Sequence, residues 1–205
     1  MRQASGVRRQ ASGVRRQASG VRRQASRCHR YIEIVPAPTV CDVCGFSWES
    51  ADRSVISPRL LAATETFAEV IVAAGDLVAL RPSAERWSIL EYGGHLRDVM
   101  ISIRERIMLA AIVDAPTGVA MNREERIARG FYHLDTADEV VAELSMLTRL
   151  FLKTVASLDA DDFARTLTYS GATPYQVTIG WAAAQAVHEA EHHLRDAQDN
   201  LSSLL

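Results

Sequence analysis

Apolar residues recur every three or four positions from about residue 58 to the C-terminus, and this spacing predicts amphipathic helices. The pattern divides into four long segments and one short one, at about 58–75, 88–113, 136–158, 177–202 and, for the short one, 122–129. Residues 166–169 favour a brief extended piece, but no alternating pattern of strand type competes with the helices. The expected fold class is therefore all-α, as a four-helix bundle.

Local signals mark where these helices begin. Pro58 stands at a first helical position, where its missing N–H costs nothing. Ser88 with Glu91, and Thr136 with Glu139, have the spacing of a capping box, in which each side chain satisfies the other's backbone N–H. The sequence therefore predicts helix starts at these three places.

The first 27 residues repeat the heptad Arg-Gln-Ala-Ser-Gly-Val-Arg three times and begin a fourth copy. Ala and Val fall at heptad spacing, but they bury little, and each glycine costs about 1 kcal/mol relative to alanine in a helix. We therefore expect a disordered tail at 1–27, with an arginine arm for nucleic acid or an anionic membrane as the alternative. A lead-in at 28–56 then joins this tail to the bundle domain at 57–205.

Charge and composition narrow the class of protein. Residues 1–30 hold nine of the 23 basic side chains and no acidic one, so the remainder has 14 basic against 25 acidic side chains, a net charge of −11. Nucleic-acid binding by the folded part is not expected, because phosphate binding needs clustered cations. No apolar run approaches the ~18 residues of a membrane span, no signal-peptide pattern is present, and three cysteines do not suggest a disulfide framework. These features favour a cytoplasmic protein without membrane attachment.

The lead-in contains a possible zinc motif. Cys41 and Cys44 form a CxxC followed by glycine, which resembles half of a zinc knuckle. Cys28 and His29 could supply the other half, although adjacent residues make an awkward chelate. The alternative is a pair of reduced thiols on a partly ordered lead-in whose aromatic residues dock on the bundle. A redox CxxC is less favoured, because no βαβ pattern surrounds it.

Histidines gather in the last predicted helix, at positions 188, 192 and 193, and His95 lies in the second. Residues four apart share a helix face, so His188/His192 and Glu189/His193 are each a pair of potential metal ligands. A third ligand from a neighbouring helix would leave a divalent metal with an open position. That is the pattern of a catalytic site rather than a structural one.

The apolar stripes of the two helices favour one pair. They are Ile179, Ala183, Ala186, Ala190, Leu194, Ala197 and Leu201 on the last helix, and Ile89, Gly93, Leu96, Met100, Ile103 and Ile107 on the second. At roughly 100° per residue, Glu189 and His193 fall on the flank of one stripe and His95 on the border of the other. His188 and His192 lie nearly opposite, where they would face solvent or another helix. We therefore predict a metal site of His95, Glu189 and His193, with His188 and His192 as the alternative pair.

The segment from Trp87 to Asp98, which holds Ser88, Glu91 and His95, and the late helix with paired histidines resemble the DinB-like superfamily over about residues 58–203. That superfamily includes mycothiol- and bacillithiol-linked S-transferases. The resemblance implies a bundle that binds a divalent metal through one histidine of the second helix and two residues four apart on the last.

Within that superfamily the maleylpyruvate isomerase branch has a Glu-xxx-His-xx-Asp pattern, which Glu189, His193 and Asp196 match. The commoner His-xxx-His version matches His188 and His192. Two glycines just before His95 depart from the larger residues usual there, and we expect them to loosen that turn.

Three protein ligands and an open position suit Zn²⁺ or a similar ion that takes a low-molecular-weight thiol as its fourth ligand and lowers the pKa of that thiol. With the resemblance, this favours a mycothiol-type S-transferase that acts on a small electrophile, or a thiol-dependent isomerase. Two alternatives remain. One is a non-catalytic stress or scaffold protein, which could form a homodimer through its helix faces, and the other is a metal-dependent hydrolase.

Three further residues are candidates for supporting roles. Asp98 and Asp196 each follow a candidate histidine by three positions and could orient its imidazole. Arg195 could bind a carboxylate of the substrate. Pairing of these acids with neighbouring arginines on the helix surface is the alternative.

Overall fold

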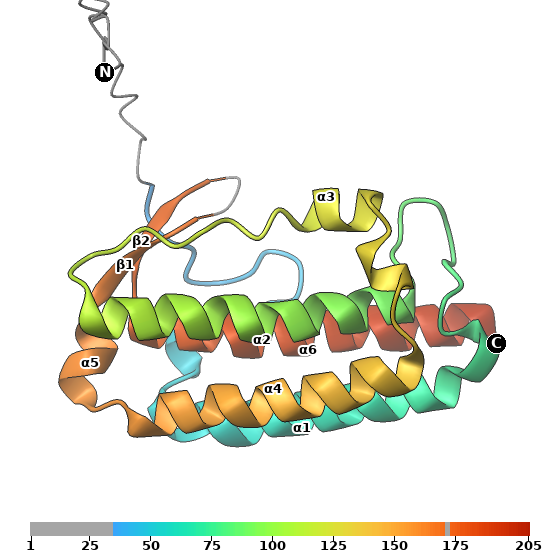
Figure 1. Cartoon of the computed structure of the whole chain (residues 1–205), viewed down its shortest axis with the longest axis horizontal. Helices are drawn as coiled ribbons and strands as arrows, with labels where there is room; N and C mark the ends of the chain where they lie inside the picture. The colour runs from blue at the N-terminus through green and yellow to red at the C-terminus, as the bar shows by residue number, and fades with distance from the viewer. Residues whose placement is uncertain (1–34, 171–172) are drawn as a thin grey trace, which may run out of the picture. The chain divides into compact units, whose positions relative to one another are not determined.

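The computed structural model describes residues 35–170 and 173–205, so the heptad tail at 1–27 and the Cys28-His29 half of the predicted zinc knuckle lie outside the described residues. Four long helices form the body, which confirms the predicted four-helix bundle (Figure 1). They are α1 (Arg53–Ala74), α2 (Ile89–Ile112), α4 (Ala137–Ser157) and α6 (Ile179–Leu204). The smaller elements are α3 (Arg123–Ala128), α5 (Ala160–Ala164), the 3₁₀ turns η1 (Trp48–Ser50), η2 (Gly75–Leu77) and η3 (Phe131–His133), and the strands β1 (Thr166–Tyr169) and β2 (Tyr175–Thr178).

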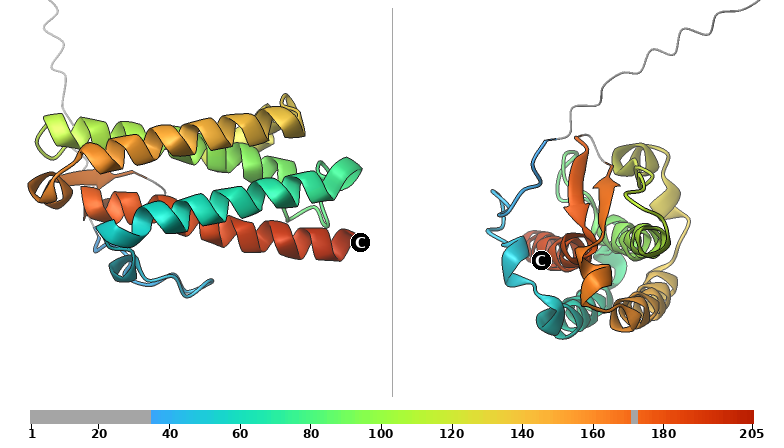
Figure 2. Two further views of the ribbon diagram at one scale, coloured as in Figure 1. Left: turned by 90° about the horizontal axis from the view of Figure 1, so that it is seen from below. Right: turned by 90° about the vertical axis from the view of Figure 1, so that its left-hand side faces the viewer.

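The order of the helices around the bundle differs from their order along the chain. Both α1 and α2 pack against α4 and α6, so the order around the bundle is α1, α6, α2, α4 (Figure 2). The connection from α1 to α2, at 75–88, and the connection from α4 to α6, at 158–178, each cross a diagonal of the bundle. This arrangement makes α2 and α6 neighbours, and the groove between them holds the candidate site.

The helix starts follow the capping signals in two cases of three. The capping boxes of Ser88 with Glu91 and of Thr136 with Glu139 are both formed, as predicted. The start at Pro58 was wrong, because α1 begins at Arg53, with Pro58 inside it. Asp52 caps this earlier start by accepting a hydrogen bond of 2.8 Å from the backbone N–H of Ser54. The added turn buries Ile56 completely, which offsets the hydrogen bond that proline cannot make.

The extended piece at 166–169 is strand β1, which confirms that prediction, and it pairs with β2 in an antiparallel hairpin. The opposed pair Leu167 and Val177 is buried, so this hairpin seals one end of the bundle. The last helix therefore starts at Ile179, two residues later than expected. Thr178 caps it by accepting from the backbone N–H of Trp181 at 3.0 Å.

The predicted apolar stripes of α2 and α6 face the core, but α6 is covered more widely than its stripe indicates. Ala182, Ala184 and Val187 are each at most 1% exposed, although they lie off that stripe. The cover comes from the lead-in, whose buried aromatic side chains Phe46 and Trp48 pack on this helix. The expectation that His188 faces solvent or another helix was therefore wrong, since both its ring nitrogens are buried beneath the lead-in.

Helix α2 runs without a break through Gly93 and Gly94, so these glycines do not loosen it. A Cβ atom added at Gly93 would lie 2.8 Å from Cγ1 of Val140, and one at Gly94 would lie 2.8 Å from Cδ1 of Tyr132. Glycine is needed because two neighbouring side chains approach the backbone at contact distance. This close packing fixes the turn that carries His95.

None of the described helices has the combination of length and apolar content that crossing a membrane requires.

Candidate metal centre

Helices α2 and α6 bring three potential ligands to one point. The Nε2 atom of His95 lies 3.3 Å from Oε2 of Glu189, and Nε2 of His193 lies 3.2 Å from the same oxygen. Nitrogen and oxygen ligands around a tetrahedral zinc at 2.0–2.1 Å lie ~3.3 Å apart. Both pairs therefore already have the spacing that such an ion needs, and one ligand atom of each residue lies within 4.8 Å of the others. All three are largely buried, with His95 only 1% exposed.

Two further side chains hold this group in place. Oδ2 of Asp196 lies 2.9 Å from Nδ1 of His193, as the sequence spacing predicted, and so turns Nε2 toward Glu189. The amide of Gln185 donates to Oε1 of Glu189 at 2.6 Å, and Trp48 Nε1 donates to the Gln185 oxygen at 2.8 Å. One carboxylate oxygen of Glu189 is thus fixed by the protein, and the other points at the two histidines.

One proton on His193 balances the negative charge of the Glu189 carboxylate. Burial opposes the charged form of His193, but hydrogen bonds to Asp196 and Glu189 outweigh it and raise the pKa of His193 to about 9. Burial would raise the pKa of Glu189, yet its contacts with both histidines hold that pKa well below its ordinary value. Burial lowers the pKa of His95, so this imidazole is neutral and has a free lone pair. A divalent ion would replace the proton on His193.

The residues fit a divalent metal on the chemistry of their donors. Two imidazoles and one carboxylate are a ligand set used by catalytic zinc. Among the described residues, Nδ1 of His95 is buried and has no hydrogen-bond partner, so the only polar contact of this ring is the one that Nε2 makes with the carboxylate of Glu189. Asp98 does not orient His95, and the alternative is confirmed, because Asp98 accepts from the neighbouring Arg97 at 3.2 Å. It also bonds Arg126 and accepts from Tyr132 Oη at 3.1 Å.

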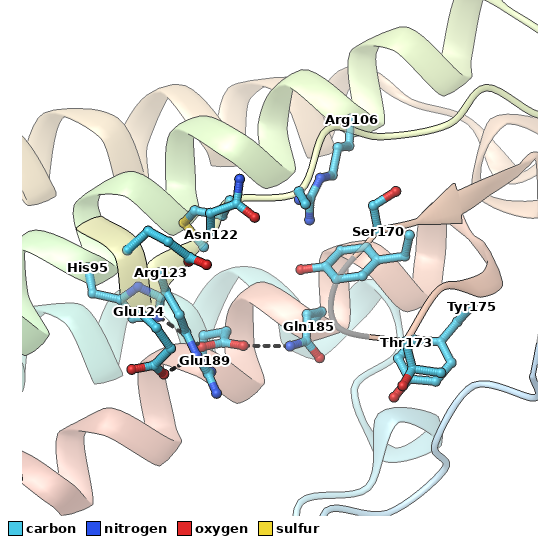
Figure 3. Close-up of a pocket in the computed structure, with 14 residues that line it drawn as sticks. His95, Arg106, Asn122, Arg123, Glu124, Ser170, Thr173, Tyr175, Gln185 and Glu189 are labelled. Atoms are coloured by element: carbon cyan, nitrogen blue, oxygen red, sulfur yellow. Dashed lines mark hydrogen bonds and ion pairs between the residues drawn. The ribbon is translucent and has the colours of Figure 1, made fainter. Parts of the chain in front are cut away.

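A cavity of about 480 Å³ opens beside the group, and His95 and Glu189 form part of its wall (Figure 3). Its other walls come from α3 and the segment before it, and from the β hairpin. Arg106 and Tyr169 lie toward the hairpin end, with the guanidinium 4.3 Å from the centre of the Tyr169 ring. The volume lies in the range of small-molecule sites, about 300–1,000 Å³.

The alternative pair lies elsewhere. His188 and His192 face the lead-in, where their ring nitrogens gather with the thiols of Cys41 and Cys44. Arg195 is also engaged there, because it donates to the backbone carbonyl of Cys44 at 2.8 Å. The two sets of ligands suggested by the last helix therefore belong to two different places.

Sequence reasoning missed several residues of this region. Gln185 had a usable signal, since it precedes Glu189 by four positions on the same helix face. Arg106, Tyr169 and the α3 residues that line the cavity had none, because only the fold brings their segments to α2 and α6.

The comparisons with known proteins agree with this description. A solved structure described as "YfiT from Bacillus subtilis is a probable metal-dependent hydrolase with an unusual four-helix bundle topology" matches with a TM-score of 0.67 and 13% sequence identity, over 83% of this chain and 93% of the other. That likeness concerns the fold. No protein of curated function matches the chain. The sequence model of the DinB superfamily matches residues 59–197, which include all three candidate ligands, and the chain therefore belongs to the DinB superfamily.

Proposed function

We propose that this protein binds a divalent metal, zinc first among them, through His95, Glu189 and His193, and transfers a low-molecular-weight thiol of the mycothiol type to a small electrophile. The observation that carries the proposal is the position of these donors. They converge on one point between two helices, and two of them form the wall of a cavity large enough for a small molecule.

A bound zinc ion would supply Lewis-acid chemistry, because it lowers the pKa of a thiol so that a nucleophile forms near neutral pH. The protein's own residues do the rest. Asp196 holds the ring of His193 through Nδ1, and Gln185 holds the carboxylate of Glu189. Both partners keep the ligand atoms aimed at one point before the metal arrives, which reduces the cost of ordering them.

The second substrate would occupy the cavity toward Tyr169. Arg106 is only 4% exposed, and its Nε has no hydrogen-bond partner among the residues that the structure describes. A buried guanidinium with a free donor favours an electrophile that carries a carboxylate or carbonyl oxygen. An unsaturated acid, the substrate class of a thiol-dependent isomerase, has that chemistry.

Metal-dependent hydrolysis is the second candidate function, and it is favoured by the description of YfiT as a probable metal-dependent hydrolase. In that case water, rather than a thiol, would be the nucleophile. A metal-binding scaffold without turnover is the third reading.

The test measures metal content and turnover together. Purified full-length protein is analysed for zinc, then assayed with mycothiol or bacillithiol and a chlorinated fluorogenic electrophile, and separately with an activated ester. His95→Ala and Glu189→Gln are compared with His133→Ala and Glu191→Gln, which change the same residue types outside the site.

We expect zinc-dependent consumption of the thiol that the first two variants abolish and the last two retain. Zinc-dependent ester hydrolysis without any effect of the thiol would replace the transferase with the hydrolase. Stoichiometric zinc with neither activity would favour the scaffold, and unchanged zinc binding in His95→Ala would contradict the ligand set.

A further inference from the structure

A second group of metal-ligand side chains lies on the other flank of α6, between this helix and the lead-in. One ligand atom each from Cys41, Cys44, His188 and His192 lies within 4.8 Å of all the others. Two thiols and two imidazoles are the ligand set of a structural zinc site, in which all four positions are filled by protein. We propose that these four residues bind a structural zinc ion that fastens the lead-in to the last helix.

The backbone presents both pairs correctly. In the lead-in, the N–H of Gly45 donates to the carbonyl of Cys41 at 2.8 Å, and the N–H of Cys41 donates to the carbonyl of Phe46 at 2.8 Å. Gly45 has a φ of +72°, a conformation that a side chain makes costly, so the glycine permits the tight turn that puts both thiols on one side. On α6, His188 and His192 are four apart and therefore project from one face.

The donor spacing is close to that of a bound ion. Sγ of Cys41 lies 3.9 Å from Nδ1 of His192. Around a tetrahedral zinc with sulfur at 2.3 Å and nitrogen at 2.0–2.1 Å, a sulfur and a nitrogen ligand lie ~3.6 Å apart. A shift of a few tenths of an ångström at this pair would complete the contact.

His188 provides an independent observation. Both its ring nitrogens are shielded from solvent, and neither has a hydrogen-bond partner anywhere in residues 35–170 and 173–205. The ring lies against Phe46 and Trp48, with centroid distances of 5.2 and 4.8 Å. A buried polar atom without a partner costs about 1–3 kcal/mol, and a metal bond would remove that cost for one nitrogen.

Neighbouring residues support the site as they do in other zinc centres. Nε2 of His192 lies 3.7 Å from Oδ2 of Asp196, so a small movement would let this imidazole donate to a carboxylate while Nδ1 binds the metal. Arg195 bonds the carbonyl of Cys44, and Arg59 stacks on Phe46 with its guanidinium 4.9 Å from the ring centre. The lead-in is thus held against α6 around the four ligands.

The proposed structural zinc site would also support the centre of His95, Glu189 and His193. It anchors the segment that ends at Trp48, and Trp48 holds Gln185, which in turn holds Glu189. The structural zinc would therefore hold in place the hydrogen bonds that run from Trp48 through Gln185 to Glu189, although it contacts no ligand of the first centre. The proposal itself does not depend on catalysis at that centre.

Cobalt substitution tests the site in the full-length chain carrying Cys28→Ser, so that Cys41 and Cys44 are the only thiols left. Cobalt bound to thiolates gives a near-ultraviolet charge-transfer band that the His95, Glu189 and His193 centre cannot give, because it contains no sulfur. We expect this band in the Cys28→Ser protein and its loss in Cys41→Ser and Cys44→Ser. His95→Ala should retain it, whether or not the first centre binds metal.

Zinc protection provides a readout that needs no ligand variant. In the Cys28→Ser protein, a thiol reagent should detect two cysteines without zinc and none with two equivalents of zinc per chain, which are enough to fill both proposed sites, and His188→Ala should lose this protection. The proposal would be overturned by any of three results. These are a missing cobalt band, thiols that react equally with and without zinc, and a disulfide between Cys41 and Cys44 in the purified protein. So would loss of the site in Cys28→Ser or His29→Ala, which would assign the thiols to the N-terminal pair instead.

Discussion

Asp196 binds the imidazole of His193 on the side away from Glu189, with 2.9 Å between Oδ2 and Nδ1. The same oxygen lies 3.7 Å from Nε2 of His192, the neighbouring histidine that faces the lead-in. One carboxylate therefore stands behind two imidazoles that point to different places. This relationship explains how adjacent histidines on one helix can serve two separate groups of ligands.

The first prediction concerns this carboxylate. Asp196→Asn keeps the shape of the side chain but weakens the hydrogen bond that orients His193, and loss of such a partner lowers metal affinity about 10–100-fold. Competition with a chelating dye measures the zinc affinity of the His95, Glu189 and His193 centre, with Cys41→Ser present in every protein compared so that the second proposed site does not contribute. Asp199→Asn, an exposed acid on the same helix, is the matched control and should change nothing. Equal affinity in Asp196→Asn and the parent protein would remove this residue from the account.

Gln185 gives the second prediction, because it connects Trp48 to Glu189 through two hydrogen bonds. Gln185→Leu removes both hydrogen bonds and leaves Trp48 and Glu189 without this partner. We expect it to lower the free energy of unfolding by about 1–3 kcal/mol. Zinc affinity should fall as well, since Glu189 loses the bond that fixes its orientation. Urea denaturation and chelator competition measure the two effects, with the exposed Gln198→Leu as control. A stability loss with unchanged zinc affinity would limit Gln185 to a packing role.

The third prediction tests the close packing before His95. Gly94→Ala places a methyl group 2.8 Å from the buried ring of Tyr132, and such overpacking costs about 1–3 kcal/mol, more than the gain of up to about 1 kcal/mol from replacing a helical glycine. Gly180→Ala is the matched control, because its nearest neighbour lies at 3.4 Å, an ordinary contact. Thermal denaturation should show a lower melting temperature for Gly94→Ala and an equal or higher one for Gly180→Ala. The reverse order would contradict the packing described here.

The fourth prediction concerns pH and Glu91, a fully buried carboxylate at the start of α2. Burial would raise its pKa, but hydrogen bonds from Arg81 and from the backbone N–H of Ser88 outweigh burial and hold the pKa below the ordinary value of 4.5. A group whose pKa is lowered by folding stabilises the protein above its unfolded pKa, and this contribution is lost as the pH falls through the folded pKa.

Glu91→Gln should therefore lower the free energy of unfolding by about 2–3 kcal/mol at pH 7. This gap in unfolding free energy between the variant and the parent protein should close as the pH falls below about 4.5. Urea denaturation across this pH range measures the gap. Glu65→Gln, an exposed acid on α1, should leave the curve of the parent protein in place. A gap that stays constant down to pH 3 would contradict the ion pair with Arg81.

Much of the bundle could be predicted because its signals are local. The capping boxes at Ser88 and Thr136 report helix starts within four residues of sequence, and the apolar spacing of α2 reports which face is buried. The start of α1 could not be predicted, because a proline inside a helix is tolerated only when tertiary packing, here the burial of Ile56, offsets its cost.

In the candidate sites too, local patterns could be predicted from the sequence and contacts between distant segments could not. The positions of His95, Glu189 and His193 on the borders of two stripes predicted that they could meet, and the structure brings their donor atoms together. The partners of His188 and His192 could not be predicted, because the lead-in folds back onto α6 over about 150 residues of chain. Periodicity describes the faces of one helix, and it says nothing about which distant segment covers a given face.

Anomalous diffraction at the zinc absorption edge, from crystals of the full-length protein grown with zinc, tests the central claim most directly. The account predicts a peak within about 2.2 Å of Nε2 of His95, an oxygen of Glu189 and Nε2 of His193. The claim would be contradicted if no peak appeared at this centre and His193 kept its hydrogen bonds to Glu189 and Asp196 in the presence of zinc.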